Sequence, residues 1–128
     1  NRDPAARYMC ALMAQAGIPR KDTILWNIVP WYLRANGRIQ AASSWDITAP
    51  LVYLKRLLDL LPRLEVIVLV GKRAQSAESE IRRLTDLPIH RTPHMSFRVF
   101  GVRPEKKAEM EAPFREVAAL LMENDSLA

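Results

Sequence analysis

Apolar residues recur at helical spacing in four stretches of the chain, and each stretch predicts an amphipathic helix. These stretches are residues 3–17, 47–61, 74–84 and 104–123. The first helix is expected to begin at Asp3-Pro4, with Asp as N-cap, and to end at Gly17. Pro113 lies inside the last stretch and predicts a kink or a break there.

Three shorter stretches rich in β-branched residues predict strands. They are residues 23–29, 64–70 and 87–92. Residues 64–70 (LEVIVLV) are almost continuously apolar, which is typical of a parallel strand covered on both faces. Residues 31–44 have no clean period and contain the turn signal Asn36-Gly37, so we expect a loop there.

Helices and strands thus alternate along the chain, beginning and ending with a helix. This order predicts an α/β fold, a three-layer α/β/α sandwich around a central, mostly parallel sheet. Residues 1–128 are expected to form a single domain. A sheet of three strands is thin, and a strand before Asn1 would complete it. The open edge of such a sheet would allow pairing with a second copy as a homodimer.

Composition and charge narrow the range of partners. The 128 residues include 19 Lys and Arg against 14 Asp and Glu, a net charge of +5. This balance favours an anionic partner such as nucleic acid. The single cysteine, Cys10, excludes an internal disulfide and an iron–sulfur cluster held by about four thiolates, and it favours a cytoplasmic protein. No apolar run approaches the roughly 20 residues of a membrane span, so no membrane partner is expected.

Ligands of parallel sheets bind beyond the carboxyl ends of the strands. Residues 27–32, 71–75 and 90–98 are expected at those ends. Gly71-Lys72 follows a strand, but the other residues of a phosphate-binding P-loop are missing around it. The glycine therefore predicts either a simple turn or a close approach of the backbone to a phosphate.

Two polar residues at these strand ends have more than one interpretation. Asn27 in an apolar strand is either a core amide bonded to backbone or an amide that recognises a ligand. His94 is open to a catalytic or a structural role. His90 stands four residues before it, but Pro93 between them disfavours a helix, and no metal site is expected.

A basic segment follows these residues. Arg98 and Arg103 stand near Phe97 and Phe100. Basic and aromatic residues together suit contact with nucleic acid, and the alternative is a solvated helix start above two core phenylalanines.

Three segments taken together resemble the uracil-DNA glycosylase superfamily. Residues 25–30 (LWNIVP) are similar to the family strand that ends in its base-reading asparagine. Residues 67–75 (IVLVGKRAQ) are similar to the family strand and glycine loop, commonly Gly-Ser-x-Ala-Gln, and residues 92–96 (TPHMS) to the family's histidine loop. Their order and spacing fit the family, and the similarity covers most of the chain.

The resemblance implies a uracil-DNA-glycosylase-like protein of base excision repair. Such a protein flips a uracil out of DNA and hydrolyses its N-glycosidic bond, with no metal or organic cofactor. Asn27 would then hydrogen-bond the edge of the uracil and discriminate it from cytosine. His94 would be the catalytic residue that donates to the uracil O2 and stabilises negative charge as the base leaves.

The resemblance also implies which residues contact the DNA. Gly71 and Ser96 would contact the phosphates beside the flipped nucleotide. Lys72 replaces the usual serine of the glycine loop and is counted among the DNA contacts. Arg98 and Arg103 belong to the basic segment after Ser96, which would enter or flank a DNA groove.

The chain departs from the family pattern in two motifs. The first family motif, typically Gly-x-Asp-Pro at a strand end, supplies the acid that activates water, whereas Asp3-Pro4 has no strand before it. We therefore expect this acid to lie before Asn1 or to be lost. Met95 and Phe97 replace two prolines of the histidine loop. The alternatives are an inactive family member that binds DNA or protein, and an unrelated small nucleotide-binding α/β domain.

Overall fold

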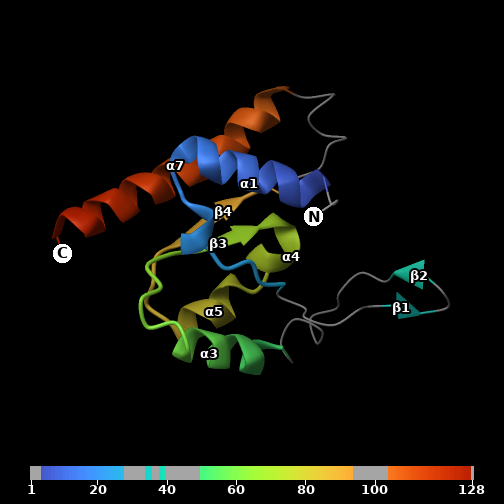
Figure 1. The fold of residues 1–128 in the computed structure, drawn as a ribbon. Helices are drawn as coiled ribbons and strands as arrows, with labels where there is room; N and C mark the ends of the chain where they lie inside the picture. The colour runs from blue at the N-terminus through green and yellow to red at the C-terminus, as the bar shows by residue number, and fades with distance from the viewer. Residues whose placement is uncertain (1–3, 28–33, 36–37, 40–49, 94–103, 128) are drawn as a thin grey trace.

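The structure, a computed structural model, describes residues 4–27, 34–35, 38–39, 50–93 and 104–127 (Figure 1). Its helices are α1 (Pro4–Ala16), the 3-10 turn η1 (Arg20–Asp22), α3 (Leu51–Asp59), α4 (Gly71–Gln75), α5 (Glu78–Leu84) and α7 (Pro104–Leu127). Its strands are β1 (Arg34–Ala35), β2 (Arg38–Ile39), β3 (Ile67–Val70) and β4 (Ile89–Thr92).

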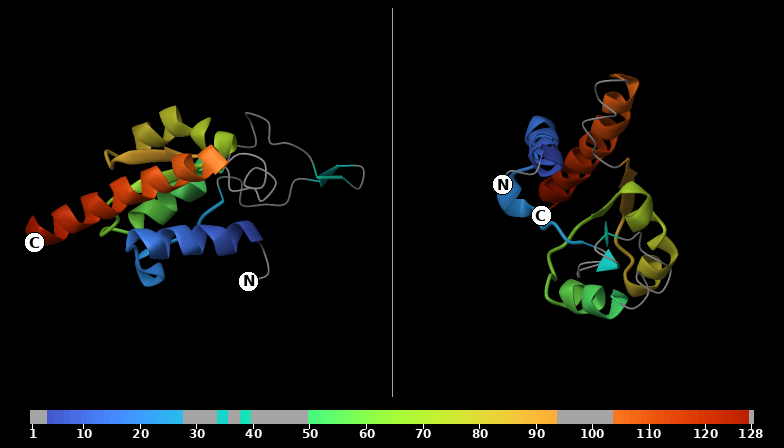
Figure 2. Two further views of the ribbon diagram at one scale, coloured as in Figure 1. Left: turned by 90° about the horizontal axis from the view of Figure 1, so that it is seen from above. Right: turned by 90° about the vertical axis from the view of Figure 1, so that its right-hand side faces the viewer.

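Strands β3 and β4 form the central sheet. They pair in parallel, with Ile67 opposite Ile89 and Val70 opposite Thr92. Successive side chains of a strand point to opposite faces, and helices cover both faces here. Figure 2 shows α1 and α7 on one side of the strands and α3 and α5 on the other. The predicted α/β fold with a parallel sheet is confirmed, in a sheet of two strands over the described residues.

The core has two parts, one on each face of the sheet. On the first face, Val66 and Val68 pack against a cluster shared by α1, Ile18 and α7. The buried residues of this cluster are Leu12, Met13, Ile18, Met110, Phe114 and Val117. On the second face, Leu69 packs with Ala77 and Ile81, and α3 contributes partly buried leucines.

Helix α1 ends as its sequence predicts. Gly17 has a φ of +87°, the left-handed conformation that glycine adopts without a steric penalty. The N–H of Ile18 donates to the carbonyl of Met13 at 2.8 Å, and the N–H of Gly17 donates to that of Ala14 at 3.0 Å. This is the Schellman arrangement, and it carries Ile18 back into the core beside Met13.

The first predicted strand is wrong over residues 23–27. These residues form no regular structure, and Ile24, Leu25 and Trp26 are exposed by 44–55%. Their β-branched and aromatic composition favours a strand, but a strand forms only where a neighbouring strand accepts its backbone bonds. Residues 28–29 of the prediction lie outside the described residues.

The predicted loop over residues 31–44 contains a short hairpin. β1 and β2 pair antiparallel, with Ala35 opposite Arg38. The two residues between them are Asn36-Gly37, the pair that most strongly favours a two-residue hairpin connection. The turn signal was therefore correct, and its flanking residues pair although they lack strand-like alternation.

Two predicted helices differ from the structure in whether they are continuous. The stretch 74–84 is two helices, and the first of them already begins at Gly71. The hydroxyl of Ser76 donates to the carbonyl of Arg73 at 2.7 Å, and this side-chain bond competes with continuation of the helix. Conversely, α7 continues through Pro113 without a break, because residues on both sides of the proline are buried in one cluster with α1.

The other predicted boundaries shift by a few residues, and α7 ends at Leu127 rather than at residue 123. α3 ends at Asp59 rather than at residue 61, and the strands begin at Ile67 and Ile89 rather than at 64 and 87. Residues 47–49, before α3, lie outside the described residues. Helix and strand ends are the least determined part of a sequence pattern, since the local propensity changes little across them.

An ion-pair cluster joins α5 to β4, and a testable prediction follows from it. Glu78 accepts two hydrogen bonds from Arg91 and one from Arg82 at 3.1 Å. The bonds from Arg91 hold the pKa of the Glu78 carboxyl below its ordinary value of 4.5. A lowered carboxyl pKa stabilises the fold above the ordinary pKa, and this contribution is lost as pH falls through the lowered value. Glu78→Gln should therefore lower the free energy of unfolding at pH 7, and this loss should become progressively smaller below about pH 4.

Urea unfolding at pH 7 and pH 3 measures this effect. Glu80→Gln on the same helix is the matched control, because no ion pair of Glu80 exists among the described residues. An equal loss at both pH values in Glu78→Gln would contradict the role of the carboxylate charge.

Candidate nucleic-acid interface

The carboxyl ends of β3 and β4 lie side by side. Val70 is opposite Thr92 at the end of the ladder, so Gly71 and Pro93 leave the sheet next to each other. Gly71 is buried and has a φ of +83°. A side chain would be strained in this conformation, which explains the glycine and the abrupt change from strand to helix. The predicted juxtaposition of the segment 71–75 with the start of the segment after β4 is therefore confirmed.

A hydrogen bond connects these two strand ends. The Nε2 of Gln75 donates to the backbone carbonyl of Thr92 at 2.9 Å. Sequence reasoning placed Gln75 within the glycine-loop pattern but assigned it no contact. The signal that could have identified Gln75 was the family pattern Gly-Ser-x-Ala-Gln, which has a glutamine four residues after the glycine.

Two exposed basic side chains lie at this edge. Lys72 and Arg73 follow Gly71 in the short helix α4 and are exposed. Within the described residues neither has an ion-pair partner. Arg91 on β4, by contrast, is held by Glu78, and this bond raises the pKa of its guanidinium. Lys72 and Arg73 are thus exposed cations at the strand ends, whereas Arg91 is engaged by Glu78.

Asn27 is the last described residue of the segment 23–27, in which residues 24–27 are exposed. The segment runs in the same direction as β3, toward the side of the molecule where β3 ends (Figures 1 and 2). Asn27 is exposed, which excludes the interpretation of a buried core amide. Trp26 beside it is 44% exposed and does not belong to the core either. An exposed amide next to an exposed indole is a suitable surface for an aromatic base.

The two histidines have different surroundings. His90 lies on β4 opposite Val68, with its Nδ1 3.4 Å from the Oε2 of Glu116 on α7. It therefore faces the α7 layer and not the strand ends. His94 lies outside the described residues.

The other DNA-contact candidates beyond β4 lie outside the described residues as well. These are Ser96, Arg98 and Arg103. Their roles remain predictions.

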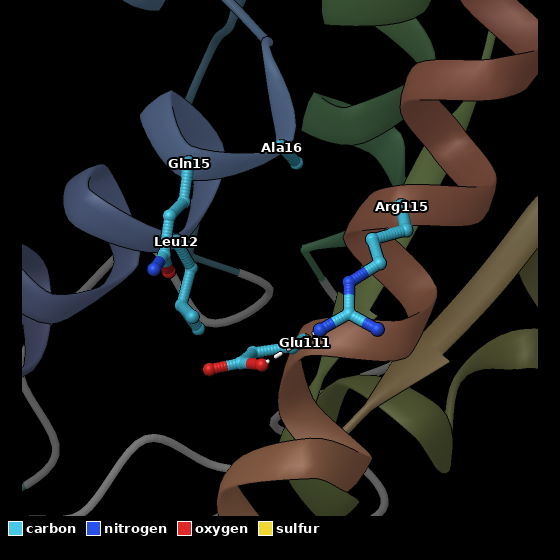
Figure 3. A pocket seen from close by; sticks show the side chains of 5 residues that line it. All are labelled: Leu12, Gln15, Ala16, Glu111 and Arg115. Atoms are coloured by element: carbon cyan, nitrogen blue, oxygen red, sulfur yellow. Dashed lines mark hydrogen bonds and ion pairs between the residues drawn. The ribbon is translucent and has the colours of Figure 1, made fainter.

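A hollow of about 200 Å³ lies elsewhere, between α1 and α7 (Figure 3). It is lined by Leu12, Gln15, Ala16, Glu111 and Arg115. Arg115 bonds to Glu111 at 2.9 Å, so its two charged groups satisfy each other. The hollow is smaller than ordinary small-molecule sites of about 300–1,000 Å³, and it does not adjoin the strand ends. We therefore place the candidate site at the strand ends.

No group of three or more His, Cys, Asp or Glu among the described residues could hold a metal ion. No described helix is both long and apolar enough to cross a membrane.

The comparison with protein families identifies the family to which the chain belongs. Residues 2–118 match the family model of the uracil DNA glycosylase superfamily. The chain therefore belongs to this superfamily, as the three strand-end segments suggested. Comparisons with curated proteins and with solved structures give no significant match.

Proposed function

We propose that this chain is the uracil-recognising part of a DNA glycosylase, which hydrolyses the N-glycosidic bond of a uracil flipped out of DNA. The proposal assigns the family's water-activating acid to none of the residues named below. The observation that supports the proposed function most is the paired end of β3 and β4. It brings the glycine turn at Gly71 next to Pro93, from which the chain continues to His94. Two of the three segments that carry the superfamily resemblance thus meet at one edge.

In the proposal, Asn27 recognises the base and His94 acts on it. An asparagine amide presents a carbonyl acceptor beside an NH2 donor group. When the carbonyl accepts from the uracil N3–H and the NH2 group donates to O4, this orientation matches uracil and not the reversed pattern of cytosine. His94 donates a hydrogen bond to the uracil O2, where negative charge develops as the glycosidic bond breaks. The exposure of Asn27 supports this role, because a base must reach the amide from solvent.

The DNA backbone would be held at the same edge. The proposal gives Gly71 and Ser96 contacts to the phosphates that flank the flipped nucleotide. A glycine lets the backbone N–H groups approach a phosphate closely. Lys72, Arg98 and Arg103 would add charge contacts, so binding should weaken steeply with increasing salt.

The test is binding and release of uracil with single-stranded oligonucleotides that carry one uracil or one cytosine. We expect the chain to bind the uracil oligonucleotide more tightly than the cytosine oligonucleotide and to release free uracil slowly, because no residue named here is assigned the role of the acid that activates water. Asn27→Asp should reduce the preference for uracil by about tenfold or more, since one bidentate base contact contributes about 1–3 kcal/mol of discrimination. Fluorescence anisotropy measures the affinities, and cleavage of the abasic product measures release.

Asn124→Asp on α7 is the matched control, because it makes the same chemical change away from the strand ends. An unchanged preference in Asn27→Asp would contradict the role of Asn27. Binding of DNA without uracil release would favour an inactive family member. Salt-independent binding would contradict the proposed charge contacts to the DNA backbone.

A further inference from the structure

One side chain joins the helix after β3 to the end of β4. Gln75 is the last residue of α4, and Thr92 is the last residue of β4. The Nε2 of Gln75 lies 2.9 Å from the carbonyl oxygen of Thr92, in a partly buried position. Thr92 itself is only 1% exposed. Its carbonyl therefore needs a protein partner, because a buried carbonyl without a hydrogen bond destabilises the fold.

The hydrogen bond between Gln75 and Thr92 lies at the end of the β3–β4 ladder. The parallel ladder ends at the pair Val70 and Thr92. After Val70 the chain turns into α4 at Gly71, so its backbone no longer runs beside β4. The amide of Gln75 extends the connection between the two segments beyond the ladder, at the last residue before Pro93.

The residue type suits this task. The amide of glutamine donates a hydrogen bond, whereas an ionised glutamate at the same position can only accept one. The neighbouring hydroxyl of Ser76 is already used within its own turn, where it donates to Arg73 at 2.7 Å. Gln75 is therefore the described side chain that ties the glycine turn to the end of β4.

We propose that Gln75 is a positioning residue that fixes the direction in which the chain leaves β4 relative to the Gly71 turn. This inference rests on the proposed function, in which the residue beyond β4, His94, acts on the base while Gly71 holds the DNA. Gln75 touches neither base nor phosphate, and it acts through the carbonyl of Thr92. A small displacement between two groups that act on one substrate lowers the rate more than the affinity.

The first experiment compares Gln75→Met and Gln75→Glu with the unchanged protein in single-turnover release of uracil. Methionine preserves the length of the side chain but cannot donate. We expect Gln75→Met to slow release by about tenfold with little change in DNA affinity. Gln75→Glu should be equally slow at pH 8 and should approach the unchanged protein below about pH 4, where a protonated carboxyl donates again. Gln15→Met and Gln15→Glu on α1 are the matched controls.

The second experiment does not depend on activity. The chain has two histidines, and they lie two residues before and two residues after Thr92. We expect the ring NMR signals of His94 to shift in Gln75→Met, while those of His90, held in β4 beside Glu116, stay in place. Assignment uses His90→Gln. A variant that fails to fold is recognised because both histidines move to their unfolded positions, and Gln75→Glu at acid pH then replaces it.

The outcomes separate this inference from the proposed function. If the unchanged protein neither prefers nor releases uracil, the proposed function fails, while a selective shift of His94 still supports the positioning role. If both histidines keep their signals in folded Gln75 variants, or both shift equally, the positioning role is wrong whatever the activity. A loss of rate in the Gln15 controls as large as in the Gln75 variants would also overturn it.

Discussion

Replacing His94 by alanine is expected to slow uracil release by about 10²–10³-fold, the usual effect of removing one donor to a developing oxyanion. The hydrogen bond to the uracil O2 strengthens as the glycosidic bond breaks and negative charge moves onto the base. The ground-state complex gains much less from it, so the dissociation constant for uracil-containing DNA should change little. Single-turnover release and anisotropy on the same oligonucleotide measure the two quantities.

His90→Ala is the matched control, because His90 is the other histidine of the chain and lies on β4 beside Glu116. It should leave release close to that of the unchanged protein. Equal losses of rate and affinity in His94→Ala would contradict a transition-state role and indicate a structural one. If release persists in His94→Ala, the chemistry must use another group.

Replacing Phe114 by alanine is expected to lower the free energy of unfolding by about 3–5 kcal/mol. Phe114 is 3% exposed and packs among the residues that α1 and α7 share. Alanine removes the ring and leaves a cavity that the two helices could close only by moving toward each other and repacking. Since domains are usually stable by about 5–15 kcal/mol, this single change should bring the chain near its unfolding threshold.

Urea unfolding followed by circular dichroism measures this loss. Met122→Ala on the same helix is the control, because Met122 is 71% exposed and should change stability by less than about 0.5 kcal/mol. A loss in Phe114→Ala as small as in the control would mean that α7 does not pack on α1 in solution. A loss of the helix beyond Pro113 alone would show that the two halves of α7 unfold separately.

Local patterns predicted much of the fold correctly. The apolar stripes located α1, α3 and α7, and Gly17 and Asn36-Gly37 marked a helix end and a hairpin connection. These signals are reliable because they depend on the conformational limits of a few neighbouring residues. The continuous apolar run before Gly71 also predicted correctly that β3 is parallel and covered on both faces.

The patterns failed where contacts distant in sequence decide the outcome. Residues 23–27 have the composition of a strand, but a strand requires a partner, and composition does not provide one. Of the kink or break that Pro113 predicts from local sterics, the break does not occur, because the burial of α7 against α1 offsets the cost of the proline, about 3 kcal/mol.

The features of the candidate site also fall into two groups, those that the sequence determined and those that only the structure decided. The sequence by itself determined the motif residues, the glycine at the end of β3 and membership of the superfamily, because these depend on residue type and spacing. Only the tertiary structure decided that Asn27 is exposed, that Arg91 is engaged by Glu78 and that Gln75 reaches Thr92. Such contacts join residues 13 or more positions apart, and their geometry exists only after the helices have packed on the sheet.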